Sequence, residues 1–424
     1  MSAMIGDGNP SEPAPYRLRK MSIAMRREAI GSRCGPEDFA LTGESETLLE
    51  LSDVLVESAV GYFSVPIGVA EGFFVDGKKF DVPLATEEPS VVAACAYAAG
   101  IISSAGGFTT SAAAPVMTGT AYFEPDPRRD LAELLRKHAS ALLETLDRSL
   151  SRIEKRGGGR RSFDIAQVGR FVKISFDVDV RDAMGANLVN SASEAVGRRA
   201  SDLIGAPLLM AILTNASERR TAKARFSIDP QMIPRNGFAG EEIARRIVLS
   251  SELADTDPDR AVTHNKGIMN GISALALATG NDTRGVEAGA HSWAARSGRI
   301  VPLTHYQFHD GALVGKIELP LPFASTGGAV SIHPAARACL RLAGTASGTD
   351  LARLAAAVGL AQNFAALLAL VTRGIQSGHM RLHARRLAFQ AGARGPQVES
   401  VSGKMSASGN YTLEAAQQFL SLPG

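Results

Sequence analysis

The stretch Val172-Lys173-Ile174-Ser175-Phe176-Asp177-Val178-Asp179-Val180 alternates apolar and polar residues without interruption. Successive side chains of a β-strand point to opposite faces of a sheet, so this pattern predicts a strand with one buried and one solvated face. Such a strand is typical of an antiparallel sheet that is covered on one side only. The alternation is therefore the first constraint on the fold.

Helical patterns flank this strand on both sides. Before it, leucine and isoleucine recur at helical spacing, which predicts an amphipathic helix from Arg128 to about Lys155, ended by the glycines at 157–159. After it, the sequence predicts a helix over 187–203, an apolar strand over 208–213 and an alternating strand over 222–228. This order of elements predicts a compact α+β domain rather than a doubly wound repeat.

Apolar segments precede this region. Residues 72–82 predict a hairpin whose Asp76-Gly77 pair suits a tight turn with positive φ. Residues 89–123 carry no charge, but only 91–102 is strongly apolar, and a membrane span needs about 20 apolar residues. We expect a buried helix of small residues there, closely approached by neighbouring backbone.

Beyond about Gly240 the chain is expected to be mostly helical. Alanine-rich helices over 273–278 and 350–371 are expected to pack against a further strand over 313–319. Residues 372–392 predict a separate C-terminal helix, with a polar tail after it.

The composition excludes several classes of protein. The 424 residues are 45% apolar, 21% charged and 6% aromatic, which favours a sizeable core in two or more domains over intrinsic disorder. The 45 Lys and Arg against 43 Asp and Glu leave a net charge of +2, so nucleic acid is not an expected partner. Three distant cysteines and an N-terminal segment without an apolar signal region predict a cytoplasmic protein without disulfides or structural zinc.

Standard cofactor and nucleophile motifs are absent from the sequence. No complete Gly-x-Gly-x-x-Gly follows a strand, and Gly311–Ile317 is one residue short of a phosphate loop. No Gly-x-Ser-x-Gly elbow and no His-Glu-x-x-His occur. His379 and His383 lie one helical turn apart, but no carboxylate at ligand spacing accompanies them, so no metal is predicted.

Several segments place ionisable or amide groups among glycine and alanine. Taken singly, each has a structural explanation. Glu88 would interact with a helix dipole, and Asp182 and Asn281 would cap helices. Lys266 would lie on a solvated helix face and His379 would be an ordinary, partly buried histidine. The segments are Glu87–Ser90, Asp182–Asn187, Thr263–Gly271, Ala278–Asp282 and Ser377–Met380.

Together these segments resemble the 3-hydroxy-3-methylglutaryl-coenzyme A (HMG-CoA) reductase family, and its bacterial class II branch more than the membrane-anchored animal branch. The resemblance runs from about residue 50 to 395. The chain departs from the family at one motif: where the family has Glu-Asn-Val-Ile-Gly, this sequence has Glu57-Ser58-Ala59-Val60-Gly61 and so lacks the asparagine. The other matching segments are Val65–Ala70, Glu87–Ala94, Gly106–Ser111, Val180–Asn187, Thr263–Ile272, Ala278–Asp282, Gly327–Ala329, Val358–Asn363 and Gly378–Met380.

The resemblance implies an α+β fold in four parts. A large, mostly helical domain would bind HMG-CoA, and a small ferredoxin-like, non-Rossmann domain inserted in it would bind NAD(P). A C-terminal helical flap would hinge at Gly374 and Gly378. It also implies a homodimer, or a higher oligomer, with shared active sites and no membrane. The expected parts are an N-terminal arm (1–40), the large domain (41–124 and 230–371), the small domain (125–229) and the flap (372–424).

The implied reaction is reduction of the HMG-CoA thioester to mevalonate and coenzyme A with two NADH or NADPH, in isoprenoid synthesis. Lys266, in a buried site, would stabilise the oxygen that becomes anionic. His379 would protonate the departing thiolate, because histidine titrates near neutrality. Glu88 would deliver a proton in a closed site, where desolvation favours the neutral carboxyl. Asp282 would hold Lys266 and Glu88 in register.

Further residues match family positions that hold the substrate or the nucleotide. Arg260 would capture a carboxylate in bidentate fashion. Small residues in the Asp182–Asn187 turn would let backbone amides approach a phosphate. Arg160 and Arg161 would favour a 2′-phosphate, whereas Asp164 would favour a free ribose hydroxyl. The substrate-binding set is Ser90, Asn215, Arg260, Asn270 and Gln362, and the nucleotide-binding set is Asp164, Asp182, Met184, Gly185 and Asn187.

Two alternatives to the biosynthetic enzyme stay open at this point. The same site would also run oxidatively, in a pathway that consumes mevalonate. A catalytically silent protein that binds acyl-CoA or nucleotide on the same scaffold is the other alternative, although all four candidate catalytic residues are present.

Overall fold

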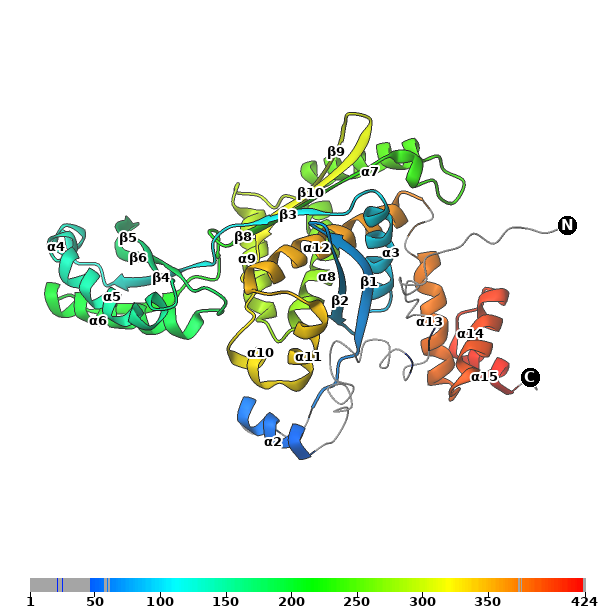
Figure 1. Ribbon diagram of the computed structural model, residues 1–424, viewed down its shortest axis with the longest axis horizontal. Coiled ribbons are helices and arrows are strands. Elements are labelled where there is room, and N and C mark those ends of the chain that lie inside the picture. The colour runs from blue at the N-terminus through cyan, green and yellow to red at the C-terminus, as the bar shows by residue number, and fades with distance from the viewer. Residues whose placement is uncertain are drawn as a thin grey trace.

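The computed structural model describes residues 21, 25, 46–56, 59, 62–372, 374 and 376–421. It is a mixed helix-and-sheet protein in which a sheet with three helices lies at one end, a large central part follows, and three helices lie at the other end (Figure 1). The predicted N-terminal arm lies outside the described residues except for Met21 and Met25, as does most of Glu57–Gly61.

The strand predicted over 172–180 is confirmed as β6 (Phe171–Asp179). Its apolar side chains at 172, 174, 176 and 178 are buried under helices. It lies inside a four-stranded antiparallel sheet in the order β5-β6-β4-β7. We call this sheet and its helices the small unit; it consists of β4 (Val116–Phe123), α4 (Leu131–Lys137), α5 (Ala139–Glu154), β5 (Gly159–Val168), β6, α6 (Ala186–Ile204) and β7 (Leu208–Leu213).

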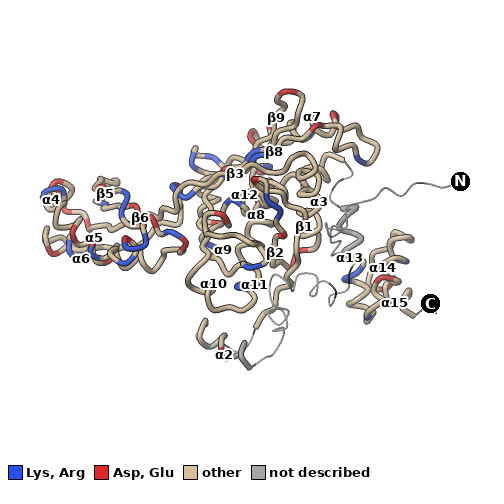
Figure 2. The backbone as a smooth tube through the Cα atoms, in the orientation of Figure 1, with Lys and Arg blue, Asp and Glu red and all other residues tan. Residues whose placement is uncertain are grey.

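Two boundaries in the small unit differ from the sequence prediction. The helix expected over 128–155 is two helices, because the backbone at His138 turns away from helical angles between α4 and α5. β4 already belongs to this sheet, so the sheet begins before the compositional break at Pro125. Figure 2 shows basic and acidic residues interspersed along the backbone of this unit.

The strand expected over 222–228 does not belong to the small unit, which corrects the sequence prediction. As β8 (Thr221–Ile228) it lies in a second antiparallel sheet, ordered β3-β8-β10-β9. Alternation identifies a buried face but not the strand's partners, and these come from elsewhere in the chain. The partners are β3 (Thr109–Ala112), β9 (Thr304–His309) and β10 (Ala312–Pro320), the last covering the strand expected at 313–319.

The predicted hairpin and the small-residue helix are both confirmed. β1 (Ile67–Val75) and β2 (Lys78–Ala85) pair across a turn in which Asp76 and Gly77 have φ of 48° and 81°. Helix α3 (Val91–Ser104) packs on this hairpin so closely that a Cβ on Gly72 would lie 3.8 Å from the Gly100 Cα.

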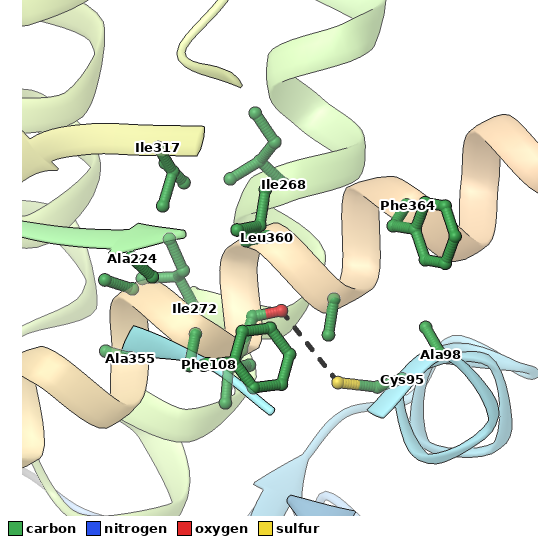
Figure 3. Packing of buried hydrophobic residues seen from close by; sticks show 14 of the residues in the cluster. Cys95, Ala98, Phe108, Ala224, Ile268, Ile272, Ile317, Ala355, Leu360 and Phe364 are labelled. Atoms are coloured by element: carbon green, nitrogen blue, oxygen red, sulfur yellow. Dashed lines mark hydrogen bonds between the residues drawn. The ribbon is translucent and has the colours of Figure 1, made fainter. Parts of the chain in front are cut away.

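Helix α12 (Gly348–Leu370) is the centre of the large core. It is long and apolar enough to cross a membrane, but 89% of its most apolar window is buried inside the protein. Figure 3 shows Leu360 of α12 facing Ile268 of α8, and Cys95 of α3 pointing to a backbone carbonyl of α12. The other helices of this part are α2 (Glu46–Leu55), η3 (Pro230–Met232), α7 (Gly240–Thr256), α8 (Pro258–Ala278), α9 (Thr283–Ala295), α10 (Gly328–Ile332) and α11 (Pro334–Ala343).

The C-terminal segment is more ordered than the sequence predicted. The expected helix is α13 (Gln376–Gln390), but two further helices replace the expected polar tail, namely α14 (Pro396–Ser408) and α15 (Leu413–Ser421). Apolar residues spaced along 384–420 pack all three helices around their own core.

The chain passes between the two sheets twice. It leaves the second sheet after β3 and returns to it at β8, and there the Ala113 amide donates to the Thr221 carbonyl at 2.8 Å. Buried residues between Met117 and Ala206 form one core, separate from the core around α12. We call the part around α12 the large unit.

Candidate active site

The predicted catalytic lysine and glutamate lie together. The Lys266 ammonium, on α8, is 2.7 Å from Glu88 Oε2, in the loop between β2 and α3. This ion pair joins two segments that are 178 residues apart in sequence. The fold therefore brings a cation and a carboxylate to one place on the large unit.

The expectation that Lys266 is buried is wrong for the single chain. Its side chain is 61% exposed and that of Glu88 is 34% exposed. The reason lies in the orientation of α8, because Lys266 lies on the side of that helix that faces away from the core. Val262 and Leu277, at helical spacing from Lys266, are also exposed, at 55% and 47%. Lys266 thus belongs to an uncovered, partly apolar helix face.

Asp282 does not contact Lys266 in the single chain. Its carboxylate caps α9, where Oδ1 accepts the Gly285 amide at 3.1 Å. Among the described residues, no ion pair joins Asp282 to Lys266. Asp282 is therefore a helix cap within one chain, a role that the sequence analysis had not given it, and the expected link to Lys266 and Glu88 is not made there.

Ser90 adopts a strained backbone next to the ion pair. It precedes α3 with φ 78° and ψ −20°, in the left-handed region, and makes no side-chain cap to the helix. A non-glycine residue in this region costs roughly 1–3 kcal/mol and is commonly found at functional sites. The hydroxyl that would normally cap the helix is left for another partner.

Gln362 of α12 lies where that helix crosses α8, the helix that carries Asn270. Gln362 is 5% exposed, and its buried Oε1 has no hydrogen-bond partner in the described chain. A Cβ on Gly271, the neighbour of Asn270, would lie 3.1 Å from the Gln362 Cβ, so the two helices touch here. An unsatisfied buried amide oxygen costs about 1–3 kcal/mol, which favours a donor from a ligand.

Arg260 and Asn215 lie at other edges of the large unit. Arg260, in the first turn of α8, is half-buried; burial lowers the pKa of its guanidinium and nearby Asp257 opposes that shift. Asn215 is exposed, and its carbonyl packs against Gly289 of α9. These two residues are not in contact with the Glu88–Lys266 pair.

The predicted nucleotide-binding turn connects β6 to α6. Gly185 is the N-cap of α6 with φ 87°, and no side-chain cap or acidic residue occupies the first turn. The free amides of that turn form an N-terminus suited to a phosphate. Met184 and Asn187 flank Gly185 on this turn.

Asp182 anchors this turn to the large unit. Its carboxylate accepts the Gly348 amide at 3.1 Å, at the start of α12. Its carbonyl accepts the Ser325 and Thr326 amides at 3.0 and 3.3 Å. Asp182 therefore fixes the position of the turn through bonds inside the protein.

Arg220 is a residue of this region that the sequence analysis missed. It is 4% exposed, and its guanidinium donates to the carbonyls of Ala183, Met184 and Phe323. Burial lowers the pKa of Arg220 to about 10, and the charges of Asp179 and Asp182 oppose the shift. The available signal was a pair of arginines, Arg219 and Arg220, a few residues after the matched Asn215 and directly before an alternating strand.

The two arginines considered for a 2′-phosphate already have carboxylate partners. Arg160 binds Asp147 through two hydrogen bonds, at 2.7 and 3.0 Å, and Arg161 lies 2.8 Å from the buried Asp179. Asp164 is exposed on β5. A phosphate would therefore compete with existing ion pairs at both arginines.

The side chain of His379 lies outside the described residues; its backbone belongs to α13. Among the described residues, no group of three or more His, Cys, Asp or Glu side chains has the arrangement of a metal site.

His264, two residues before Lys266, belongs to a buried polar network that the sequence did not predict. Its Nε2 lies 2.5 Å from Thr304 Oγ1, which in turn donates to Asn363 Oδ1 at 2.9 Å. Because Thr304 has one proton to donate, Nε2 carries the histidine proton, and Nδ1 is buried without a partner. Burial, together with the charges of Arg260 and His305, lowers the pKa of His264 to about 3.

This neutral histidine predicts a loss of stability in acid. The unfolded chain protonates His264 below its ordinary pKa of about 6.5, whereas the folded chain does so only near pH 3. The contribution of the neutral His264 to the free energy of unfolding is complete above about pH 6.5. Below that pH the free energy of unfolding falls by up to about 1.4 kcal/mol per pH unit. Replacing His264→Gln removes this proton linkage, so the wild-type advantage in unfolding free energy should shrink from pH 7 to pH 4.

Urea titrations at each pH would measure this difference, with the exposed His291→Gln as the control. A wild-type advantage over His264→Gln that stays constant across this range would contradict the linkage.

The chain is similar to known proteins over most of its length. A family model described as hydroxymethylglutaryl-coenzyme A reductase matches residues 22–384. The chain is 40% identical over 410 residues to 3-hydroxy-3-methylglutaryl-coenzyme A reductase of Archaeoglobus fulgidus, covering 95% of this chain and 92% of the relative. It is 35% identical over 374 residues to the probable enzyme of Borreliella burgdorferi, covering 87% and 85%.

Solved structures agree with these relatives. The reductase of Streptococcus pneumoniae superposes with a TM-score of 0.78 at 38% identity, covering 95% of this chain and 98% of that one. A structure of that class II enzyme bound to NADPH, in open conformations, gives a TM-score of 0.78 at 38% identity, covering 94% and 99%.

Proposed function

The chain belongs to the hydroxymethylglutaryl-coenzyme A reductase family, and from that premise we propose how its residues reduce HMG-CoA to mevalonate and coenzyme A. The observation that carries the proposal is the 2.7 Å ion pair between Lys266 and Glu88, which two separate matched segments bring together. A polarising cation beside a proton-donating acid is what reduction of a carbonyl requires.

NADPH, which a pneumococcal relative binds, is the proposed reductant. It supplies the hydride in each of the two reductions. The uncapped N-terminus of α6 fits its pyrophosphate, because the first-turn amides are free and no acidic side chain repels phosphate there. Gly185, Met184 and Asn187 would form this site, with Asp182 holding the turn in place. Asp164 would lie near the ribose.

Lys266 is proposed to stabilise the carbonyl oxygen as negative charge develops on it. A fixed ammonium is most effective where water is excluded, and in the single chain its face of α8 is exposed. Glu88 is a carboxylate in its ion pair with the ammonium, so it would first take up a proton as the site closes and loses water, and would then pass that proton to the oxygen. Asp282 would complete the set from the α9 N-terminus.

His379 is proposed to protonate the thiolate of coenzyme A when the hemithioacetal breaks down. The thiolate of a thiol with a pKa near 8.5 is protonated readily by an imidazolium, and the resulting thiol no longer attacks the aldehyde. The C-terminal helices α13–α15 are proposed as the flap that carries this histidine over the site.

The remaining candidate residues are proposed to hold the substrate. Arg260, half-buried and without a carboxylate ion pair among the described residues, would bind the HMG carboxylate. The unpartnered Gln362 Oε1 would accept the substrate hydroxyl, beside Asn270. Ser90 and Asn215 would complete the binding set.

A homodimer is proposed to close this site. Lys266 lies between the exposed Val262 and Leu277 on one face of α8, and a second copy of the chain would bury these side chains together. Burial by the partner would also supply the water exclusion that the single chain lacks. We further propose a cytoplasmic enzyme in which the small unit, from β4 to β7 (116–213), is the nucleotide-binding domain and is inserted in the large unit, which binds HMG-CoA.

A direct assay tests the proposed function. The purified enzyme should consume two NADPH for each HMG-CoA, measured as loss of nicotinamide absorbance against mevalonate formed. Assays with NADH in place of NADPH would establish the coenzyme preference. One NADPH per thioester, or no consumption at all, would contradict the four-electron reduction.

A further inference from the structure

The guanidinium of Arg220 lies at the junction of the two units. Its backbone immediately precedes β8, in the sheet of the large unit, and its carbonyl accepts the Leu321 amide at 3.0 Å. Its side chain crosses to the small unit and donates to the carbonyls of Ala183 and Met184, each at 3.4 Å. A third, shorter hydrogen bond goes to the carbonyl of Phe323, in the large unit.

These bonds reach the turn that directly precedes α6. Ala183 and Met184 lie two residues and one residue before Gly185, the N-cap of α6, whose first turn has no side-chain cap. Ala183 also pairs with Thr326 as an isolated parallel bridge. The turn is thus held to the large unit by Arg220 on one side and by the Asp182 and Thr326 bonds on the other.

The charge and shape of arginine matter at this position. The side chain is almost completely buried, so its charge must be balanced inside the protein, and the carboxylates of Asp179 and Asp182 provide that balance. A planar guanidinium donates to three carbonyls at once, which a lysine ammonium on a flexible stem does with less fixed geometry. At a water-exposed position, water would satisfy the same carbonyls, and an arginine with three fixed hydrogen bonds would not be needed.

We propose that Arg220 is a positioning residue that sets the α6 N-terminus, and hence the nucleotide, at the right place relative to the substrate residues of the large unit. The proposal rests on the assignment of the nucleotide to this turn. Arg220 contacts none of the substrate candidates on α8, so HMG-CoA binding should be independent of it.

The test compares Arg220→Lys and Arg220→Gln with Arg219→Gln. Arg219 is the adjacent arginine, is 67% exposed and binds Asp177 at 3.0 Å, so it controls for loss of a neighbouring charge. We expect KM for NADPH to rise at least about tenfold in Arg220→Gln and less in Arg220→Lys, with KM for HMG-CoA nearly unchanged, because misplacement by about 1 Å is costly. Arg219→Gln should match the wild type.

Hydrogen–deuterium exchange without nucleotide provides a second readout. Amides of residues 182–188 should exchange faster in Arg220→Lys than in the wild type, while those of β6 stay protected. This measurement remains informative if Arg220→Gln fails to fold, and it is independent of turnover. A wild-type protein that turns over no HMG-CoA would refute the proposed function, but it would leave the exchange result standing.

Equal rises in KM for both substrates, or unchanged KM for NADPH together with unchanged exchange at 182–188, would overturn the positioning role. The first outcome would make Arg220 a general structural residue, and the second would show that Arg220 does not set the position of this turn.

Discussion

Replacing Lys266→Ala should lower kcat for HMG-CoA reduction by at least about 10³-fold, because the oxygen that becomes anionic loses its cation. The side chain is exposed in the single chain, so its removal leaves no buried cavity, and the variant should keep the wild-type unfolding free energy. It should still bind NADPH, since Lys266 lies in the large unit and the nucleotide turn in the small one. Single-turnover rates and nucleotide fluorescence would measure the two properties.

Lys223→Ala is the matched control for this variant. Lys223 is also an exposed lysine paired with a glutamate, Glu318, at 3.0 Å, but it lies on β8. The control should turn over at the wild-type rate. If Lys266→Ala also kept the wild-type rate, the catalytic assignment and the mechanism built on it would be discarded.

Replacing His379→Gln should separate the two reductions. Breakdown of the thioester requires a proton for the departing thiolate, whereas reduction of free mevaldehyde releases no thiol. General acid catalysis contributes about 10²–10⁴-fold, so thioester reduction should slow by about that factor and mevaldehyde reduction far less. Parallel steady-state assays with the two substrates would measure the ratio.

His383→Gln, one helical turn further along α13, is the control for a changed histidine in the same helix, and its side chain is exposed. It should slow neither reaction. Equal losses on thioester and aldehyde in His379→Gln would exclude thiol protonation as its role.

Patterns local in sequence predicted the elements well. The structure confirms three such predictions, namely the alternating strand β6, the small-residue helix α3 and the Asp76-Gly77 turn. Each depends on interactions between residues close in sequence or on which face of the element is buried. The pairing of β8 was not predictable in this way. A strand that is buried on one face carries no record of which sheet supplies its neighbours, because hydrogen bonding between strands uses the backbone alone.

In the site, too, local sequence motifs identified residues, but they did not predict features that depend on contacts between segments far apart in sequence. The matched motifs identified Glu88 and Lys266, which the fold brings together, but not that the face of α8 carrying Lys266 is uncovered in one chain. Arg220 escaped notice because its role depends on carbonyls near residues 183 and 323, which no local pattern connects to it. Asp282 is a helix cap within the single chain, as its position before α9 allowed.

The hydrogen bond between the Ala113 amide and the Thr221 carbonyl makes the small unit suitable for exchange between relatives. It places the points where the chain enters and leaves the small unit side by side. A segment whose two ends lie close together can be replaced by a homologous segment without moving the rest of the fold. Grafting the corresponding segment of a relative between these two positions should transfer that relative's coenzyme preference while leaving recognition of the acyl thioester to the recipient.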